Sequence, residues 1–273
     1  MGARKIPIYL ILVVLSVLWI APVFFTFIVS FKTAQDFVSQ KFYDMPTSVA
    51  FLDNLRQVMK MYKLNAHFVN SLIYAVAGAA VAVVTASMAG FSIVRLRPKF
   101  NFLLFLVIYS GTLFPFQMYL IPVYRLFNAF GLYDTRAGMI LIYSAICIPF
   151  SLFVYRGFYT TIPREIEEAA KLDGCGPMRS FLSIFVPQSL PPTAVVGLFQ
   201  MTWIWNDLLF GMVLSRTQNV RPIMVALATM SGYGGGNIPW IMTGVIVTSI
   251  PTILLFVVLR RFFIQGMVMS VTA

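Results

Sequence analysis

Charged residues are scarce in this 273-residue chain, and so are the residues that build disulfides and metal sites. Only 11% of the residues are charged, whereas 59% are hydrophobic, and the mean hydropathy is +0.85. This composition excludes a water-soluble fold and is typical of a polytopic membrane protein. The single histidine, His67, and the two cysteines, Cys147 and Cys175, have neither the number nor the spacing of a disulfide framework or a metal site. We therefore expect no bound metal.

Catalytic motifs are missing as well. The chain contains no G-x-x-x-x-G-K-[ST] loop, which is the turn that usually cradles the phosphates of ATP. It also contains no His-Glu-x-x-His, Ser-His-Asp or paired intramembrane carboxylate pattern that would indicate a membrane hydrolase. We therefore expect a chain that is not an enzyme, has no catalytic residue and binds no cofactor, with energy supplied by another protein. The net charge of +11 does not indicate nucleic acid, because Lys and Arg are scattered at the ends of apolar stretches.

Six apolar stretches are long enough to cross a bilayer, which requires about 20 helical residues. The first lies between Lys5 and Lys32 and contains no charge, and it lacks a convincing small-residue cleavage site, so we expect a retained membrane helix. The other predicted spans are 68–94, 101–124, 137–155, 183–205 and 240–259. The sequence thus predicts an all-α polytopic membrane protein with six transmembrane helices.

The order of these stretches predicts three parts of the chain. Residues 1–65 contain the first span and an external loop with a short helix near 54–63, residues 66–262 form a five-helix core, and residues 263–273 form a cytoplasmic tail. Arg95, Arg97 and Lys99 crowd one short loop, which the positive-inside rule places in the cytoplasm. Arg4, Lys5, Arg260 and Arg261 agree with this orientation, so both termini are expected in the cytoplasm.

Two of the spans have unusual compositions. The second is crowded with alanine and glycine, including Gly78 and Gly90, and such small residues let membrane helices pack closely. The fifth contains Pro187, Pro191 and Pro192, each of which removes a backbone donor and leaves a carbonyl that lipid cannot satisfy. We predict a bent helix that lines a cavity, although a simple packing kink would have the same sequence.

The only dense acidic cluster of the chain follows the fourth span. Pro163 suits the first turn of a helix, and the glutamates after it complement the positive end of the helix dipole. Glu167 precedes Lys171 by four residues, the spacing of a side-chain ion pair, and Gly174 can adopt the left-handed conformation that ends a helix. The sequence predicts a short cytoplasmic helix over 163–174 with a narrow apolar face formed by Ile166, Ala169, Ala170 and Asp173. These features alone fit a solvated loop helix as well as a docking helix.

The spacing beyond this helix distinguishes the two. Glu168-Ala169-Ala170 is followed after three residues by Gly174 and after nine more by Ile184-Phe185-Val186-Pro187. This pattern resembles the EAA signature of the membrane subunits of binding-protein-dependent ABC importers. The resemblance implies a coupling helix that docks on an ATPase subunit and transmits its closure. The implied coupling residues are Glu168, Ala169, Ala170, Asp173, Gly174 and Pro187.

Further motifs resemble the smaller membrane subunit of carbohydrate importers of the maltose type. They are Asn70-Ser71-Leu72 in the second span, Trp205-Asn206-Asp207 at the end of the fifth and RRFFIQG over 260–266, whereas the ending 267–273 departs from that family. The resemblance implies an inner-membrane protein in bacterial or archaeal lipid. Its implied partners are a second homologous permease subunit, two ATPase subunits that carry ATP and Mg, an extracytoplasmic solute-binding protein and a sugar. No nucleic acid is implied.

Neutral polar and aromatic side chains are the candidates for contact with the solute, because amides and aromatic faces together bind uncharged sugars. The candidate substrate-path residues are Asn70, Ser71, Gln117, Gln200, Trp203, Trp205 and Asn206. A loop over 231–237 is expected to contact substrate or partner. Two alternatives stay open: a stand-alone secondary carrier or facilitator, disfavoured because the spans lack ionisable residues for a proton relay, and an ABC permease for a non-sugar solute.

Overall fold

The computed structural model describes residues 6–232 and 236–271, with side chains described over 7–232 and 236–258, and this part of the chain contains helices but no strand. Contacts divide the chain into two compact units. The first combines Met1–Ala66 with Val225–Ile250, and the second combines His67–Met224 with Pro251–Ala273. The predicted division into residues 1–65, 66–262 and 263–273 remains a prediction. In the structure, residues 225–250 group with the first segment of the chain.

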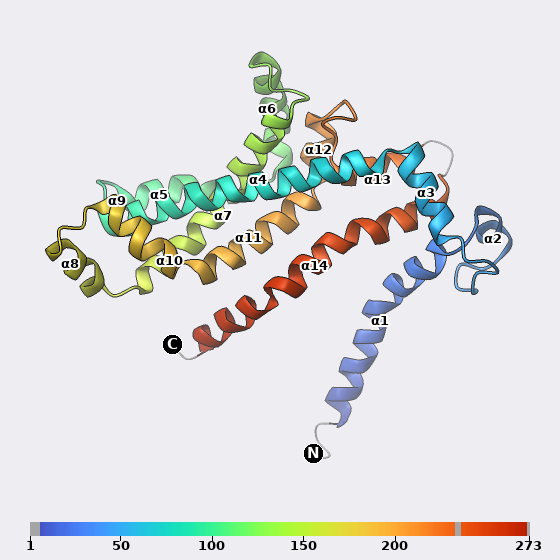
Figure 1. Ribbon diagram of the computed structural model, residues 1–273, viewed down its shortest axis with the longest axis horizontal. Helices are drawn as coiled ribbons and strands as arrows, with labels where there is room; N and C mark the ends of the chain where they lie inside the picture. Colours follow the sequence, from blue (N-terminus) through green and yellow to red (C-terminus); the bar gives the residue numbers. More distant parts are fainter. Residues whose placement is uncertain (1–5, 233–235, 272–273) are drawn as a thin grey trace. The chain divides into compact units, whose positions relative to one another are not determined.

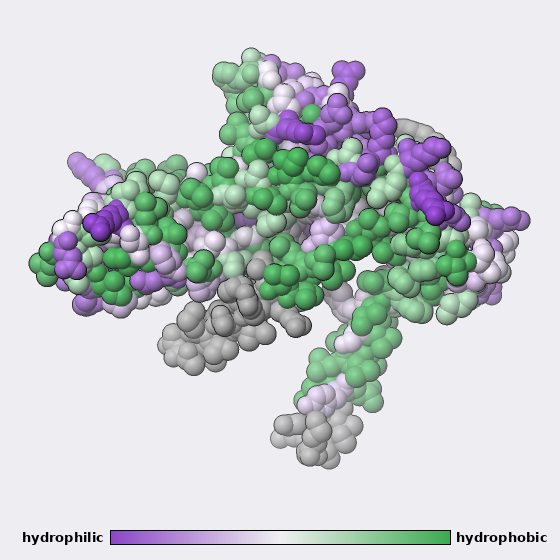
Figure 2. Space-filling view, viewed as in Figure 1, coloured by the Kyte–Doolittle hydropathy of each residue, from purple (hydrophilic) through white to green (hydrophobic). Residues whose placement is uncertain are grey.

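The first unit contains α1 (Ile6–Ser30), α2 (Ala34–Ser39), α3 (Phe51–Met61), most of α13 (Ile223–Met230) and the beginning of α14 (Ile238–Val271). Most apolar side chains of α1 before Ile28 are exposed, as Figure 2 shows, and Trp19 is 82% exposed. Such a surface is expected of a helix that faces lipid. The Asn54 side chain from α3 donates to the Ser30 and Lys32 carbonyls at 2.9 Å each, which satisfies groups left unpaired at the end of α1.

Three long helices form the centre of the second unit. The first, α4 (Leu64–Phe91), continues into the π-helix η2 (Ser92–Leu96), and it runs beside α7 (Arg136–Thr161) and α11 (Leu190–Trp205) (Figure 1). A Cβ atom added to Gly78 would lie 3.2 Å from the Cβ atom of Tyr143, and one added to Gly90 would lie 3.1 Å from that of Tyr155. The predicted close packing of this glycine-rich span is confirmed.

The third predicted span is not one continuous helix. It divides into α5 (Asn101–Tyr109), the 3-10 turn η3 (Ser110–Thr112) and α6 (Gln117–Ala129), and the two parts meet at an angle of 98°. Pro115 lies in the break, where it lacks a backbone donor and biases the preceding residue away from helical dihedrals. The sequence predicts a span over 101–124 and does not indicate this break within it.

The fifth span is bent, as its prolines predict. The segments α9 (Pro177–Ser180), η4 (Phe181–Phe185) and α10 (Val186–Gln188) meet α11 at 73°, and the break falls at Ser189. Four helices within the described residues are long and apolar enough to cross a membrane, and the number rises to six if each bent pair forms one span. Two short helices complete the second unit, α8 (Arg164–Leu172) and α12 (Leu209–Leu214).

Candidate functional site

The short helix α8 has the local structure that its sequence predicts. It begins after Pro163, which occupies the N-cap rather than the first turn, and the residue that follows its C-cap, Gly174, has a φ of +75°. Glu165 and Glu167 lie in the first turn, where the positive end of the helix dipole stabilises carboxylates. The predicted ion pair is present, with Lys171 Nζ 2.7 Å from Glu167 Oε1. In Figure 1, α8 projects beyond the ends of α5 and α7, away from the long helices.

Two adjacent glutamates on α8 differ in burial. The Glu167 side chain is 11% exposed, and its second oxygen lies 3.7 Å from the guanidinium of Arg95 at the end of α4. Glu168 is exposed and belongs to no ion pair among the described residues. The Glu167 carboxylate therefore holds α8 against Arg95, whereas the Glu168 carboxylate is exposed and accessible to a partner.

The free surface of α8 is wider than the sequence predicts. Ala169, Asp173 and Gly174 are exposed, and Ala170 is half-buried. Leu172 is 90% exposed, although it lies outside the face that the helical spacing selects. A single apolar residue in a polar loop is not by itself a signal in the sequence, because isolated exposed apolar side chains are common.

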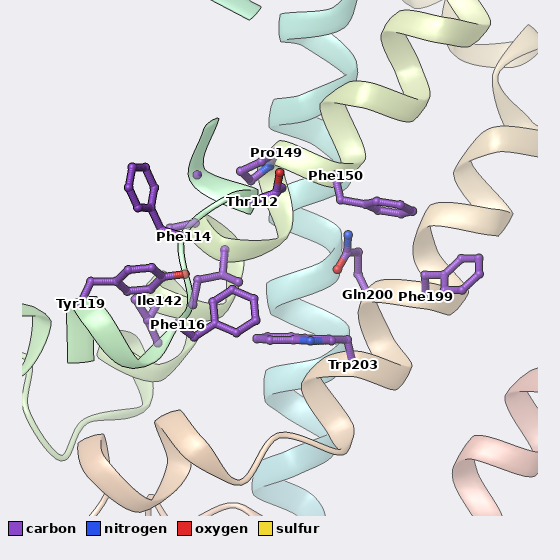
Figure 3. Close-up of a pocket in the computed structure, with 13 residues that line it drawn as sticks. Thr112, Phe114, Phe116, Tyr119, Ile142, Pro149, Phe150, Phe199, Gln200 and Trp203 are labelled. Atoms are coloured by element: carbon purple, nitrogen blue, oxygen red, sulfur yellow. The ribbon is translucent and has the colours of Figure 1, made fainter. Parts of the chain in front are cut away.

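The break in the third span helps to form an aromatic cavity of about 520 Å³ in the second unit. Figure 3 shows Phe116 and Tyr119 from α6 and its approach, Pro149 and Phe150 from α7, and Gln200 and Trp203 from α11 around this space. Gln200 Nε2 donates to the Cys147 carbonyl at 3.2 Å and to Ser151 Oγ at 3.3 Å, which fixes the amide at the wall. Among the residues whose side chains the structure describes, the Tyr119 phenol is the one ionisable group that lines the cavity.

A second cavity of about 840 Å³ shares Phe116, Phe199 and Trp203 with the first, and Asn206 and Asp207 line it as well. Trp203 is 5.4 Å from Phe116, ring centre to ring centre, so this pair forms part of both walls. Trp205 lies elsewhere: its ring is 5.1 Å from that of Phe68, and it lines a separate apolar hollow. Of the predicted substrate-path residues, the structure thus brings together Gln200, Trp203 and Asn206.

Asn70 and Ser71 are buried and face a loop rather than either cavity. Asn70 Nδ2 donates to the Arg221 carbonyl at 3.1 Å, Ser71 Oγ accepts from the Ile223 amide at 2.8 Å, and Tyr74 donates to the Val220 carbonyl at 2.7 Å. These side chains of α4 hold residues 215–223, which we call the pinned segment. Gln117 is exposed at the start of α6 and lines neither cavity.

Asp134 holds the other end of the pinned segment. Its Oδ1 atom accepts from the Arg216 amide at 2.8 Å and from the Thr217 amide at 3.0 Å. Partial burial raises the pKa of Asp134, but the backbone hydrogen bonds from Thr217 and Arg216 lower it more, so the net pKa lies below its ordinary value. The ionised carboxylate is therefore the form that holds the segment.

Replacing Asn70 with alanine should lower thermal stability, because the Arg221 and Gln218 carbonyls lose a buried donor. We expect a loss of about 1–3 kcal/mol in the free energy of unfolding. Asn128→Ala is the matched control, since that exposed amide bonds only to a carbonyl one turn earlier. Thermal unfolding in detergent measures both variants, and equal midpoints would contradict the pinning role.

Some predicted features fall partly outside the described residues. They include residues 233–235 of the loop over 231–237, the charged residues Arg4 and Lys5, and the last two residues of the tail over 263–273. The side chains of Arg260 and Arg261 are not described either. Pro187 lies in α10, at the bend of the fifth span and away from the free surface of α8.

Comparison with known proteins places this geometry in a family. Residues 82–265 match the profile described as "Binding-protein-dependent transport system inner membrane component". The melibiose/raffinose/stachyose import permease protein MelC of Bacillus subtilis is 28% identical, over 90% of this chain and 88% of its own, and the trehalose transport system permease protein SugB of Mycobacterium tuberculosis is 29% identical, over 98% and 97%. The crystal structure of a bacterial ABC transporter involved in the import of the acidic polysaccharide alginate contains a chain with the same fold, with a TM-score of 0.83, 18% identity and coverage of 96% and 99%. The chain belongs to the family of binding-protein-dependent transport system inner membrane components, the multi-pass membrane permeases of ABC importers.

Proposed function

We propose that α8 is the coupling helix on which an ATPase subunit docks. The observation that carries this proposal is an exposed helix that ends at a left-handed glycine and presents Leu172, 90% exposed, next to Asp173. Burying the exposed Leu172 side chain in an apolar cleft of a partner would be favourable, because apolar surface is removed from water. The proposed contact residues are Glu168, Ala169, Ala170, Asp173 and Gly174, with Leu172 added, and Pro187 lies at the bend through which movement continues.

The proposed assembly follows from this docking site. Importers of this family work with ATPase subunits and a solute-binding protein, and we propose two ATPase copies, which bind ATP and Mg, and a second homologous permease beside this chain. Both termini and α8 then lie in the cytoplasm, as the charges around Arg95 favour. Closure of the ATPase dimer would move α8 and open the bundle alternately toward the two sides of the membrane.

The proposed solute is a sugar or oligosaccharide. The 520 Å³ cavity combines the Trp203, Phe116 and Phe150 rings with the Gln200 amide, and aromatic faces with neutral hydrogen-bonding groups suit an uncharged sugar ring. MelC and SugB are named for the import of sugars, which supports the same class. Among the proposed path residues, Gln200, Trp203 and Asn206 line one or both of the two aromatic cavities. We also keep the proposal for four residues that line neither of these cavities: Asn70, Ser71, Gln117 and Trp205.

A panel of solutes tests this function in the assembled complex, purified with its ATPase subunits and binding protein and reconstituted in liposomes. Neutral oligosaccharides should stimulate ATP hydrolysis and be taken up, whereas amino acids and peptides should do neither. Stimulation by an amino acid or peptide alone would indicate a non-sugar ABC permease. Uptake by this chain alone, without ATPase subunits, would indicate the stand-alone carrier.

A further inference from the structure

The guanidinium of Arg95 contacts three other structural elements in the second unit. Its Nη2 atom donates hydrogen bonds to the Tyr159 and Ile162 carbonyls at the end of α7, both at 2.6 Å. Its Nη1 atom lies 3.7 Å from Glu167 Oε2 on α8, and its central carbon lies 5.0 Å from the centre of the Phe185 ring in η4. Arg95 itself belongs to η2, at the end of α4. We call Arg95, Tyr159, Ile162, Glu167 and Phe185 the Arg95 cluster.

The cluster is protected from water. The Arg95 side chain is 4% exposed and that of Glu167 is 11% exposed, so their attraction is screened much less than that of a surface pair. The carbonyls that accept hydrogen bonds from Arg95 lie at the end of α7, where no helical amide is available to them. Removing the charge of Glu167 would therefore leave Arg95 buried without its carboxylate, which is strongly unfavourable, whereas Glu167 also pairs with Lys171.

The covalent connection alone does not fix the orientation of α8. Only Ile162 and Pro163 separate the end of α7 from the start of α8. This two-residue linker can transmit a displacement along the chain, but it leaves α8 free to rotate relative to α7. On its far side, α8 ends at Gly174, the residue type with the greatest backbone freedom. The buried ion pair supplies the missing constraint, because it holds one side of α8 against the end of α4.

We propose that Arg95 and Glu167 form the link that makes α8 move as one body with the ends of α4, α7 and η4, so that an ATPase gripping α8 displaces several spans together. This proposal rests on the docking role of α8 proposed above. Arg95 and Glu167 are positioning residues: they contact neither solute nor nucleotide. Lys171 is not part of the link, because it lies on α8 itself and is 62% exposed.

Three variants test the link in the assembled complex. Glu167→Gln keeps the shape of the side chain and removes its charge, Arg95→Lys keeps a charge but has no planar fork to join several elements, and Glu167→Asp restores the charge. Glu165→Gln and Lys171→Gln are the matched controls on the same helix. The first readout is solute-stimulated ATP hydrolysis, measured with retention of the ATPase subunit during purification.

The second readout reports geometry. Spin labels at Lys99, in the loop after η2, and at Glu165 on α8 give the distribution of distances between the two elements, and both positions are exposed. Cys175 is replaced by serine for this measurement, whereas Cys147 is buried and stays. In Glu167→Gln and Arg95→Lys the distribution should broaden, and stimulated ATP hydrolysis should fall at least about tenfold, since small displacements of a coupling element have such effects. Glu167→Asp should recover most of both.

The outcomes separate this link from the docking role. A narrow, unchanged distance distribution in Glu167→Gln, or wild-type stimulation in it, would overturn the link even if variants of the α8 surface still abolish coupling. If instead variants of that surface keep full coupling, the docking role itself fails. If Glu167→Gln does not accumulate, Arg95→Lys gives the same distance measurement in the chain alone, where an unchanged width would also overturn the link.

Discussion

Valine at position 174 should abolish solute-stimulated ATP hydrolysis while leaving membrane insertion intact. Gly174 has a φ of +75°, and a β-branched residue there is strained by about 1–3 kcal/mol. Apart from its two chain neighbours, no atom of the described residues lies within 4 Å of the position of an added Cβ, so the new side chain points into the space that we assign to the ATPase. Hydrolysis and uptake measured on the reconstituted complex check this expectation.

Gly176 provides the control for this experiment. An added Cβ there also meets no atom within 4 Å, but its φ of −71° suits any residue, so Gly176→Val introduces the same bulk two positions later without strain. We expect coupling close to that of the wild type in this variant. Full coupling in Gly174→Val, or equal loss in both variants, would count against a specific docking role for the end of α8.

The sequence was informative about α8 because local rules determine its structure. A helix that starts after Pro163, an ion pair from Glu167 to Lys171 and a left-handed Gly174 each depend on residues within one or two turns. The contact between Glu167 and Arg95 joins residues far apart in the chain, and no spacing rule predicts it. The sequence therefore indicated a helix with a free face but not which glutamate is turned inward.

The substrate path shows the same division. Gln200 and Trp203 are three residues apart on α11 and share a face, so their common cavity follows from helical spacing. Trp205 lies two positions further and faces another part of the second unit. The wall opposite Gln200 depends on the break at Pro115, and a single proline in a long apolar stretch does not reveal whether a helix bends or divides.

Asn70 and Ser71 illustrate a different limit. Buried amide and hydroxyl side chains in a membrane helix can form hydrogen bonds with a solute or with backbone groups of the protein, and the sequence looks the same in both cases. In this chain they bond to carbonyl and amide groups of the pinned segment, whose residues lie about 150 positions away. Only the folded structure supplies those partners.

The largest loss of stability is expected from Gly90→Val, at the crossing of α4 and α7. A Cβ at Gly90 would lie 3.1 Å from the Cβ of Tyr155 and 3.3 Å from the backbone nitrogen of Arg156, and a backbone atom of α7 cannot turn aside as a flexible side chain can. Separating the helices also strains the bond between Ser87 and Tyr159, now 2.6 Å. We expect a loss of about 3 kcal/mol, seen as a midpoint lower by about 6 °C or more.

Gly157→Val tests whether this effect comes from the crossing rather than from valine in a membrane helix. Gly157 lies on α7, two residues after Tyr155, but among the described residues beyond its chain neighbours nothing lies within 4 Å of an added Cβ. The new side chain therefore meets open space, and the midpoint should stay near that of the wild type. Thermal unfolding of both variants in detergent, with the yield of monodisperse protein, measures the contrast. Since η2, which continues α4, carries Arg95, the Gly90 variant should lose coupling at temperatures where it is still folded. A variant that unfolds early but couples normally would separate the packing of α4 from the movement of α8.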